Sequence, residues 1–338
     1  MQSGEGTSLR IVHHPRGRRL IVLMPLWLAG CDGPQSWLAP AGRGADTVAG
    51  LFWVVVPAAA VIWTVVIGLA VYAGAITPRP HSEKGASRLI LWGGIVAPTA
   101  TIFALMVVSL FLLRDVTGNS ADLTLNARGE QWWWRLAYED PQGRLVPVPN
   151  ELRLPVGHEA EILLTANRVI HSFWAPTLGG KIDMIPGREN RMTLTPTTPG
   201  VYRGQCAEFC GEAHAQMAFP VVVMQPDAFD DWLAGQAQPA RAPATEAARR
   251  GAELFLSEGC GACHTVRGTP ASGEVGPDLT HVGSRLTIGA GVLETSREAL
   301  IDWIAAPEVV KPGARMPGYA MLSEAELGYL ADYLMGLE

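Results

Sequence analysis

The segment Cys206–Met217 places two thiols, an imidazole and a thioether close enough together to share one loop. The thiols are Cys206 and Cys210, the imidazole is His214 and the thioether is Met217. Soft sulfur ligands combined with imidazole favour copper over hard cations such as magnesium or calcium. A blue-copper centre needs only one thiolate, whereas two thiolates at this spacing can bridge a pair of copper ions. The segment therefore predicts a binuclear copper site.

The second imidazole of such a site has to come from another part of the chain. His171, in a short segment ending at Trp174, is the best candidate, whereas His158 lies in a polar turn and is expected to be exposed. The alternative is a disulfide between the two thiols, with the His and Met as incidental neighbours. A glutamate between the thiols, Glu208, completes a pattern that favours copper over that alternative.

A second chemical signature lies near the C-terminus. Cys260-Gly-Ala-Cys263-His264 is the attachment pattern of c-type haem, with two thioether bonds and the adjacent histidine as an axial ligand. The chain has five cysteines, an odd number, so a simple disulfide framework does not account for them. Copper and haem together use four of the five.

The fifth thiol, Cys31, ends an N-terminal export signal. A basic stretch from Arg10 to Arg19 precedes the apolar run Leu20–Leu28, which is too short to span a bilayer and predicts a signal peptide over residues 1–30. The ending Leu-Ala-Gly-Cys31 resembles a bacterial lipobox, in which the cysteine is acylated. Residues 31–47 are then an exported N-terminal segment.

Two long apolar segments must anchor these centres to a membrane. Gly50–Ile76 and Leu89–Leu113 are nearly uncharged, and about 20 such residues suffice to cross the hydrocarbon core. A buried helical hairpin of a soluble protein would not need apolar residues on every face, so residues 48–117 predict a transmembrane hairpin. The basic loop Arg79–Arg88 is expected in the cytoplasm, which places both flanking parts of the chain in the periplasm or its equivalent.

The region that carries the predicted copper ligands, residues 118–232, has an all-β pattern. Short apolar or alternating segments are separated by Pro, Gly and Asn, which is typical of a Greek-key sandwich. The clearest predicted strands are Leu123–Ala127, Glu151–Val156, Ala160–Thr165 and Arg191–Thr195. The copper loop then joins two late strands, and rigid strands suit electron transfer because the ligands move little between redox states.

An Ala- and Pro-rich linker, residues 233–245, precedes a helical domain over residues 246–338. Thr245, Ser296 and Ser323 are predicted to cap its helices, the last with the spacing of a capping box. The formal net charge of −6 gives no indication of nucleic-acid binding, and the acidic excess of this last domain can attract a basic partner or be an ordinary solvated surface.

The helical domain has the features of a small domain built around haem. Gly276–Leu279 and Arg315–Tyr319 resemble the framework and distal-ligand loop of class I cytochromes c. Met316 is therefore the predicted sixth iron ligand opposite His264, since a His/Met pair raises the haem potential. Met321 is a lesser candidate that we expect to serve in packing, and His281 is expected at the surface.

Together these motifs resemble subunit II of the haem-copper cytochrome c oxidases, over about residues 31–232. The motifs are Cys206-x-Glu208-x-Cys210-x3-His214-x2-Met217, His171-Ser-Phe-Trp174, Gln131–Trp134 and Lys181–Arg188. The resemblance implies a multidomain chain: a two-helix transmembrane hairpin, an all-β cupredoxin-like Greek-key sandwich with a binuclear copper A centre, and an all-α class I cytochrome c domain.

The resemblance also implies roles for the copper-loop residues. Cys206 and Cys210 are expected as bridging thiolates, His171 and His214 as imidazole ligands, and Met217 as a weak axial ligand. The residue at position 208 is expected to give its backbone carbonyl to copper. The Glu208 carboxylate would also help to hold Mg²⁺ at the boundary with the partner subunit, which suits a hard oxygen ligand; otherwise it is a solvent-facing carboxylate.

The aromatic run Trp132–Trp134 matches the patch that receives electrons in this family, and Trp132 matches the position of electron entry. Core packing is the alternative and is expected to explain at least one of the three. The chain departs from the family pattern in one place. Many members carry a glutamate at the cytoplasmic start of the second transmembrane helix, whereas Ser87–Trp92 has none and Glu83 lies further out. The sequence leaves the proton entrance undecided.

These features predict the electron-relay subunit of a caa3-type cytochrome c oxidase. Electrons would pass from haem c through copper A to the haem of the catalytic subunit I, where oxygen is reduced to water. Expected partners are subunit I, other oxidase subunits, and cytochrome c or another upstream donor, in a bacterial inner membrane with both redox domains outside. A copper A subunit of a nitric oxide reductase is the enzymatic alternative, and a periplasmic copper-delivery lipoprotein is the non-enzymatic one.

Overall fold

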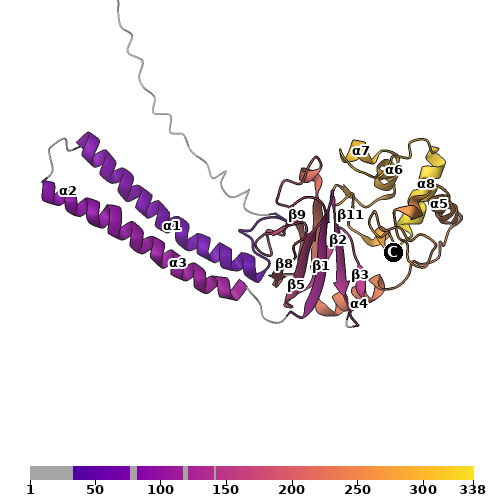
Figure 1. The fold of residues 1–338 in the computed structure, drawn as a ribbon, viewed down its shortest axis with the longest axis horizontal. Coiled ribbons are helices and arrows are strands. Elements are labelled where there is room, and N and C mark those ends of the chain that lie inside the picture. The colour runs from indigo at the N-terminus through magenta and orange to yellow at the C-terminus, as the bar shows by residue number, and fades with distance from the viewer. Residues whose placement is uncertain (1–32, 77–81, 117–120, 141) are drawn as a thin grey trace, which may run out of the picture.

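The computed structural model describes residues 33–76, 82–116, 121–140 and 142–338. It shows a long helical hairpin, a β-sandwich beside one end of that hairpin, and a small helical domain on the other side of the sandwich (Figure 1). The predicted signal peptide and Cys31 lie outside the described residues. The three-part architecture agrees with the multidomain fold expected from the sequence.

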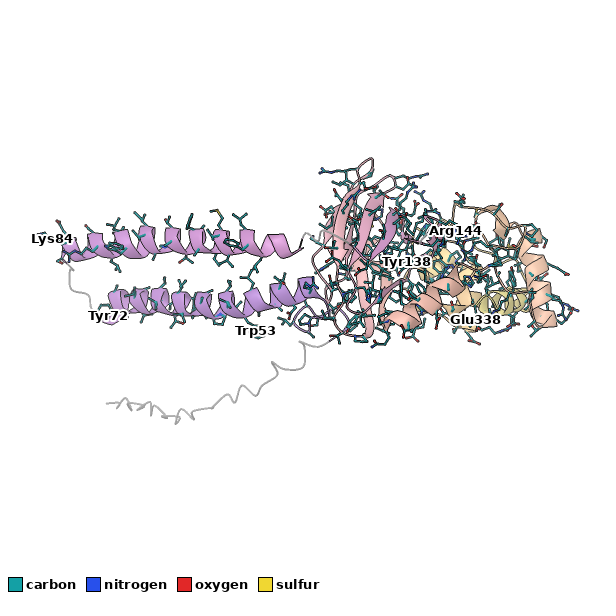
Figure 2. The ribbon with its side chains drawn as sticks, turned by 90° about the horizontal axis from the view of Figure 1, so that it is seen from below. Trp53, Tyr72, Lys84, Tyr138, Arg144 and Glu338 are labelled. Atoms are coloured by element: carbon teal, nitrogen blue, oxygen red, sulfur yellow. The ribbon has the colours of Figure 1, made fainter. Side chains whose placement is uncertain are left out.

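The hairpin consists of two helical rods with apolar side chains on their surfaces. The described residues include two helices long and apolar enough to cross a membrane, Arg43–Ala75 and Glu83–Leu112, and none of their most apolar stretches is buried. Figure 2 shows Lys84 at the tip of the hairpin remote from the sandwich. The elements are α1 (Arg43–Val71), the π-helical turn η1 (Tyr72–Ile76), α2 (Glu83–Leu89), the π-helical turn η2 (Ile90–Val96) and α3 (Ala97–Val116).

The first helix begins seven residues before the predicted apolar segment because its start is fastened to the sandwich. The backbone N–H of Ala41 donates to the carbonyl of Thr177 at 2.7 Å, and that of Arg43 donates to the carbonyl of Thr195 at 2.9 Å. Between them, a Cβ on Gly42 would lie 2.5 Å from the carbonyl oxygen of Leu178. Only glycine allows this approach, so Gly42 lets the start of α1 pack directly against the sandwich.

The sandwich consists of two five-stranded sheets, ordered β3-β2-β1-β5-β8 and β4-β10-β9-β6-β7. Its core contains four fully buried aromatic residues, Trp134, Tyr138, Phe173 and Phe219. The four strands predicted most clearly all form, as β1, β4, β5 and β8. The bounds are β1 (Leu123–Glu130), β2 (Trp133–Glu139), β3 (Leu145–Pro147), β4 (Leu152–Pro155), β5 (Ala160–Ala166), β6 (His171–Trp174), β7 (Ile182–Met184), β8 (Asn190–Leu194), β9 (Gly200–Cys206) and β10 (Ala218–Met224).

The C-terminal domain is helical, and its predicted caps are present. The side chains of Thr245, Ser296 and Ser323 each accept a hydrogen bond from the first turn of the helix that follows, and Ser323 forms a full capping box with Glu326. Its elements are α5 (Glu246–Ser257), the 3-10 turns η4 (Cys260–Ala262) and η5 (Val282–Ser284), a short hairpin of β11 (Thr287–Ile288) and β12 (Leu293–Glu294), α6 (Arg297–Ala305), α7 (Pro307–Val310) and α8 (Glu324–Met335). The preceding helix, α4 (Pro226–Gln236), packs on the sandwich instead, with Phe229 and Trp232 against Tyr138.

Two expectations for this domain were wrong. His281 is buried, because the linker folds over it and the carbonyl of Gln238 lies 3.0 Å from its Nε2. Met321 is 73% exposed and does not pack in the core. The first residues of the predicted linker are helical, because α4 continues to Gln236, and further along the N–H of Ala240 donates to the carbonyl of Arg267.

The crossing of α5 and α8 depends on Gly251, because a Cβ there would overlap the backbone carbonyl of Tyr329. We expect Gly251→Ala to lower the free energy of unfolding of this domain by about 1–3 kcal/mol through overpacking. Gly235→Ala in α4 is the matched control, because its Cβ would meet nothing within 4 Å. The Gly235→Ala variant should have an unchanged free energy of unfolding, or one raised by up to about 1 kcal/mol through the higher helix propensity of alanine. Denaturant unfolding of the purified chain measures both, and equal midpoints would contradict the close approach.

Candidate copper and haem centres

The copper loop lies between the end of β9 and the start of β10. Its two ends are tied together, because the N–H of Cys206 donates to the carbonyl of Met217 at 2.9 Å. His171 begins β6, which pairs with β9 so that Phe173 is opposite Cys206. The antiparallel register of β6 and β9 therefore brings the distant histidine to the loop, as the sequence predicted.

All five predicted side-chain donors meet in one cluster. Sγ of Cys206 lies 3.8 Å from Sγ of Cys210 and 3.8 Å from Nδ1 of His171. Sγ of Cys210 lies 3.6 Å from Nδ1 of His214 and 3.9 Å from Sδ of Met217. Both cysteines are free, and their separation is far longer than the roughly 2.0 Å of a disulfide. The geometry contradicts the disulfide alternative for these thiols.

The donor set fits copper. The sulfur atoms and His171 are buried, and soft thiolates with imidazole suit copper. The pKa of Cys206 lies well below its usual range because the Cys210 thiol and His171 hydrogen-bond to its sulfur. The pKa of Cys210 is raised by donating that hydrogen bond and by burial. The backbone carbonyl oxygen of Glu208 lies 3.2 Å from Sγ of Cys206, whereas the Glu208 side chain is exposed.

The three tryptophans of the aromatic run have different surroundings. Trp134 is fully buried in the sandwich core, so packing accounts for it as expected. The ring of Trp133 lies under the guanidinium of Arg135, with 4.6 Å from the ring centroid to the Cζ atom. Trp132 is half-buried and donates from Nε1 to the carbonyl of Cys210 at 2.9 Å. Of the three, Trp132 therefore has a direct bond to the copper loop.

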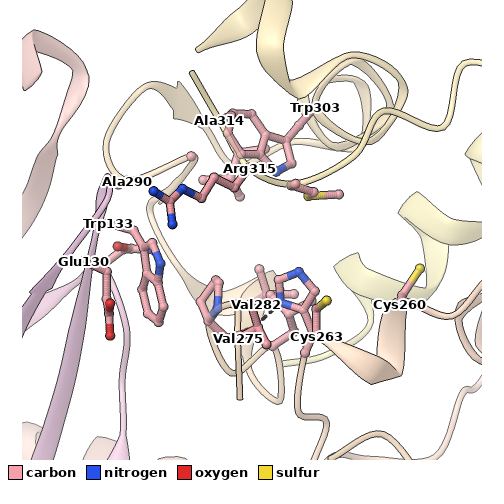
Figure 3. Close-up of a pocket in the computed structure, with 18 of the residues that line it drawn as sticks. Glu130, Trp133, Cys260, Cys263, Val275, Val282, Ala290, Trp303, Ala314 and Arg315 are labelled. Atoms are coloured by element: carbon pink, nitrogen blue, oxygen red, sulfur yellow. Dashed lines mark hydrogen bonds between the residues drawn. The ribbon is translucent and has the colours of Figure 1, made fainter. Parts of the chain in front are cut away.

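A cavity of about 610 Å³ lies beside the sandwich and is lined by the haem-attachment residues Cys260, Cys263 and His264 together with Met316. In Figure 3, Cys260 and Cys263 lie on one side of this cavity and Trp133 lies on the other. The structure thus brings the predicted haem ligands to one space, although Met316 is separated from His264 by about 50 residues of sequence.

The cavity is suited to haem in two further ways. Nδ1 of His264 bonds to the carbonyl of Pro277 at 2.8 Å, and burial lowers the histidine pKa, so Nε2 is left as a lone-pair donor for iron. Two buried polar atoms that line the cavity region, Nε of Arg285 and Oγ1 of Thr287, have no partner among the described residues. Polar groups of a ligand would satisfy them.

Comparisons with known proteins agree with both centres. Residues 138–225 match the family described as cytochrome c oxidase subunit II, periplasmic domain, and residues 248–338 match cytochrome c. Cytochrome c oxidase subunit 2 of Bacillus subtilis (strain 168) is 31% identical over 97% of this chain and 99% of its own length. The chain belongs to the cytochrome c oxidase subunit II family.

Other relatives carry the same description. Cytochrome c oxidase subunit 2 of Alkalihalophilus pseudofirmus is 36% identical over 77% of this chain and 76% of its own length. The crystal structure of the periplasmic domain of subunit II of cytochrome oxidase from Bradyrhizobium japonicum is 32% identical, with a TM-score of 0.34, and covers 36% of this chain and 96% of that one. The chain is thus a subunit of an oxidoreductase complex with an electron-relay role.

Family membership defines the coarse properties of this subunit II. It is a membrane protein with periplasmic domains, its cytochrome c domain implies haem, and its oxidase domain implies copper A. The two domains also touch each other in ways that the sequence did not predict. Nη2 of Arg315 donates to Oε1 of Gln131 at 2.7 Å, and Nη2 of Arg135 donates to the carbonyl of Glu274 at 2.8 Å.

The residue that sequence reasoning missed most clearly is Lys311. Its side chain is buried between the two domains and donates to three backbone carbonyls. Burial lowers its pKa to about 7, and the nearby Cys210 opposes that shift. Lys311 precedes a Pro-Gly turn and has no motif around it, so the sequence offers no sign that it is covered.

Proposed function

We propose that electrons enter this subunit at haem c, pass to a binuclear copper, and leave for the haem of the catalytic subunit I. The observation that carries this route is the shared wall of the haem cavity: Trp132 lines the cavity and also hydrogen-bonds to Cys210 of the copper loop. One side chain therefore contacts both centres. This side chain would link the proposed haem and copper sites.

The proposed copper site uses the five side chains that the structure gathers. Cys206 and Cys210 would bridge the two ions, while His171 and His214 would each bind one ion through Nδ1, the nitrogen that faces a sulfur. Met217 would be a weak axial ligand. The Glu208 carbonyl, directed at the same cluster, would complete the set.

The proposed haem is held by thioether bonds to Cys260 and Cys263, with His264 and Met316 as axial ligands. Support comes from their position on one cavity and from the hydrogen bond that orients the His264 ring. A His/Met pair favours the high potential that a donor to copper needs. Upstream, cytochrome c or another soluble donor would reduce this haem.

Contact with subunit I is proposed at the exposed tip of the copper loop. Glu208 is exposed there, and the neighbouring Phe209 is 75% exposed, so the loop tip offers a carboxylate and an apolar ring to a partner. We propose that the Glu208 carboxylate joins ligands of the partner in holding Mg²⁺, which prefers oxygen donors. Other oxidase subunits would complete the assembly.

We also propose how the chain is arranged in the bacterial inner membrane. Residues 1–30 would be a signal peptide, Cys31 an acylated N-terminus, 31–47 an exported segment and 48–117 a hairpin that crosses twice. Residues 118–232 would be the copper domain, 233–245 the linker and 246–338 the cytochrome domain, both on the periplasmic or outer face. The two apolar helices and the tip position of Lys84 support this arrangement.

The test is to measure copper, covalent haem and the copper EPR spectrum of the purified oxidase. We expect two coppers in this subunit per covalent haem, with one unpaired electron shared equally between the two nuclei. One copper with a mononuclear blue-type spectrum would reject the binuclear site. Substoichiometric covalent haem in an intact chain would reject the assigned attachment residues.

A further inference from the structure

The interface between the copper and cytochrome domains contains a buried cation. Lys311 is only 3% exposed, and its Nζ donates to the carbonyls of Trp132 at 2.7 Å, Gly289 at 2.8 Å and Gln216 at 2.9 Å. An ammonium group has three N–H donors, so each of them has a partner. Across the described residues, no carboxylate lies within ion-pair distance of this nitrogen. Three backbone carbonyls therefore hold the ammonium, and the nearby Cys210 also favours its charged form.

The three acceptors belong to three different parts of the relay. Trp132 lies between β1 and β2 of the sandwich, and Gln216 lies in the copper loop directly before Met217. Gly289 lies in the cytochrome domain, in the turn between β11 and β12. Lys311 itself directly follows α7, on the segment that continues to Met316. One side chain therefore joins the copper loop, the tryptophan and the haem-ligand segment.

The segment from Lys311 to Met316 also covers the Trp132 indole. A Cβ on Gly313 would lie 2.8 Å from Cζ3 of the indole, and a Cβ on Gly211 of the copper loop would lie 2.9 Å from its Cζ2. Both glycines have positive φ angles, 81° and 120°. The ring is thus in close contact with glycine backbone of both domains. A separate protein would have to displace the Gly313 segment to reach it.

Loss of the ammonium would weaken the attachment of the Lys311–Met316 segment to the copper domain. Hydrogen bonds from a charged donor are about twice as strong as neutral ones, and removal of the ammonium would leave three backbone carbonyls without their partner. The segment from Val310 to Met316 has two further bonds to the copper domain: Nε2 of Gln216 donates to the carbonyl of Val310 at 3.2 Å, and the Arg315–Gln131 bond is exposed. Elsewhere the interface is held by other bonds, such as those from Ala218 N–H to the carbonyl of Ala290 and from Leu286 N–H to the Glu151 carboxylate, so the loss acts on this segment. The linker would keep the domains tethered even when these contacts open.

We propose that Lys311 is a positioning residue that locks the cytochrome domain onto the Trp132 face of the copper domain. Locking fixes the separation of haem and copper, and it also closes Trp132 to any separate cytochrome. External donors must then deliver electrons to the fused haem. This inference rests on the electron route proposed above.

The test uses the intact oxidase with Lys311→Met, which keeps the length of the side chain but removes its charge. Haem c is reduced by a light flash in the presence of a photoreductant, and the appearance of electrons at copper is timed. We expect the haem-to-copper rate to fall on the order of 10- to 100-fold, because small displacements of reacting groups have effects of this size. The copper EPR spectrum, haem content and haem potential should stay as in the wild type.

Lys181→Met is the matched control. Lys181 is exposed and also lies beside the copper loop, with Nζ 3.5 Å from the carbonyl of Ala207, and within the described part of the chain it has no hydrogen bond or ion pair to the cytochrome domain. Its loss removes a positive charge near copper without opening the interface. The haem-to-copper rate should therefore be unchanged, and an equal fall in both variants would overturn the proposal in favour of a simple charge effect.

A second variant disturbs the packing of the cytochrome domain on Trp132 and leaves the buried ammonium of Lys311 in place. Gly313→Ala places a methyl group against the Trp132 ring, so we expect a slower haem-to-copper rate here too, even if Lys311→Met fails to fold. In both variants, a soluble ferrocytochrome should reduce copper without first reducing the fused haem. Wild-type rates in spectroscopically intact variants would overturn the positioning role. Absence of haem-to-copper transfer in the wild type would instead reject the proposed route.

Discussion

Replacing Cys210 by Ser is expected to eliminate the binuclear copper site and to reduce oxygen consumption to about 1% of wild type or less. Sγ of Cys210 is the hub of the cluster, with Cys206, His214 and Met217 all within 3.9 Å of it. A serine hydroxyl is a hard, neutral donor that copper does not favour. Changes outside the ligand shell already cost about 10- to 100-fold in metal affinity or activity, so loss of a bridging ligand should cost more.

Copper content, the EPR spectrum and oxygen uptake with reduced cytochrome measure this effect in the purified oxidase. Glu212→Gln is a control in the same loop, because Glu212 is exposed and is not one of the clustered donors. It should retain two coppers. A Cys210→Ser oxidase that kept the shared-electron spectrum would show that the bridging assignment is wrong.

Replacing both Cys260 and Cys263 by Ala is expected to remove covalent haem and unfold the cytochrome domain. The haem cavity has a volume of about 610 Å³. An empty cavity destabilises a fold by about 24 cal/mol per Å³, so loss of the haem would lower the free energy of unfolding of the domain by at most about 15 kcal/mol. This is as large as the whole stability of a typical domain. The sandwich has its own separate core, including Trp134 and Phe219, so copper binding should survive.

Haem staining, mass analysis and copper EPR distinguish these outcomes. We expect chains cut near the linker, with the copper signal intact, no electron entry through haem c, and direct reduction of copper by a soluble ferrocytochrome at the uncovered Trp132. The single variant Cys260→Ala is the graded control, since one thioether bond still holds the haem. A full-length, protease-resistant double variant without haem would contradict the idea that haem fills the domain core.

Local signals made much of the fold and the copper site predictable. The capping residues Thr245, Ser296 and Ser323 act within one helical turn, so the sequence around them is sufficient. Four copper donors lie in one short loop, and His171 was identifiable because few histidines compete with it. The membrane helices were visible from hydropathy, although the start at Arg43 was not, because it depends on backbone bonds to the distant sandwich.

The burial of three side chains was not predictable from the sequence, because it depends on whether a distant segment of the chain folds over them. His281 lies in a sequence that looks exposed, but the carbonyl of Gln238 from the linker is placed over it. Met321 looks like a packing residue, but no segment folds over it. Lys311 is the extreme case, because lysine is almost never fully buried and its three acceptors are 22 to 179 residues away. Local pattern carries no information about such partners.

The bonds between the start of α1 and the sandwich have a consequence for biogenesis. Ala41 and Arg43 complete hydrogen bonds of the copper domain, yet Ala41 precedes the first apolar helix and Arg43 begins it, while their acceptors Thr177 and Thr195 follow both helices. The domain therefore reaches its final structure only after the whole hairpin has been made, and in the proposed membrane arrangement only after both ends of the hairpin have reached the same side. Copper would be delivered to a chain that is already anchored, and a soluble fragment starting at residue 118 would lack a piece of its own domain.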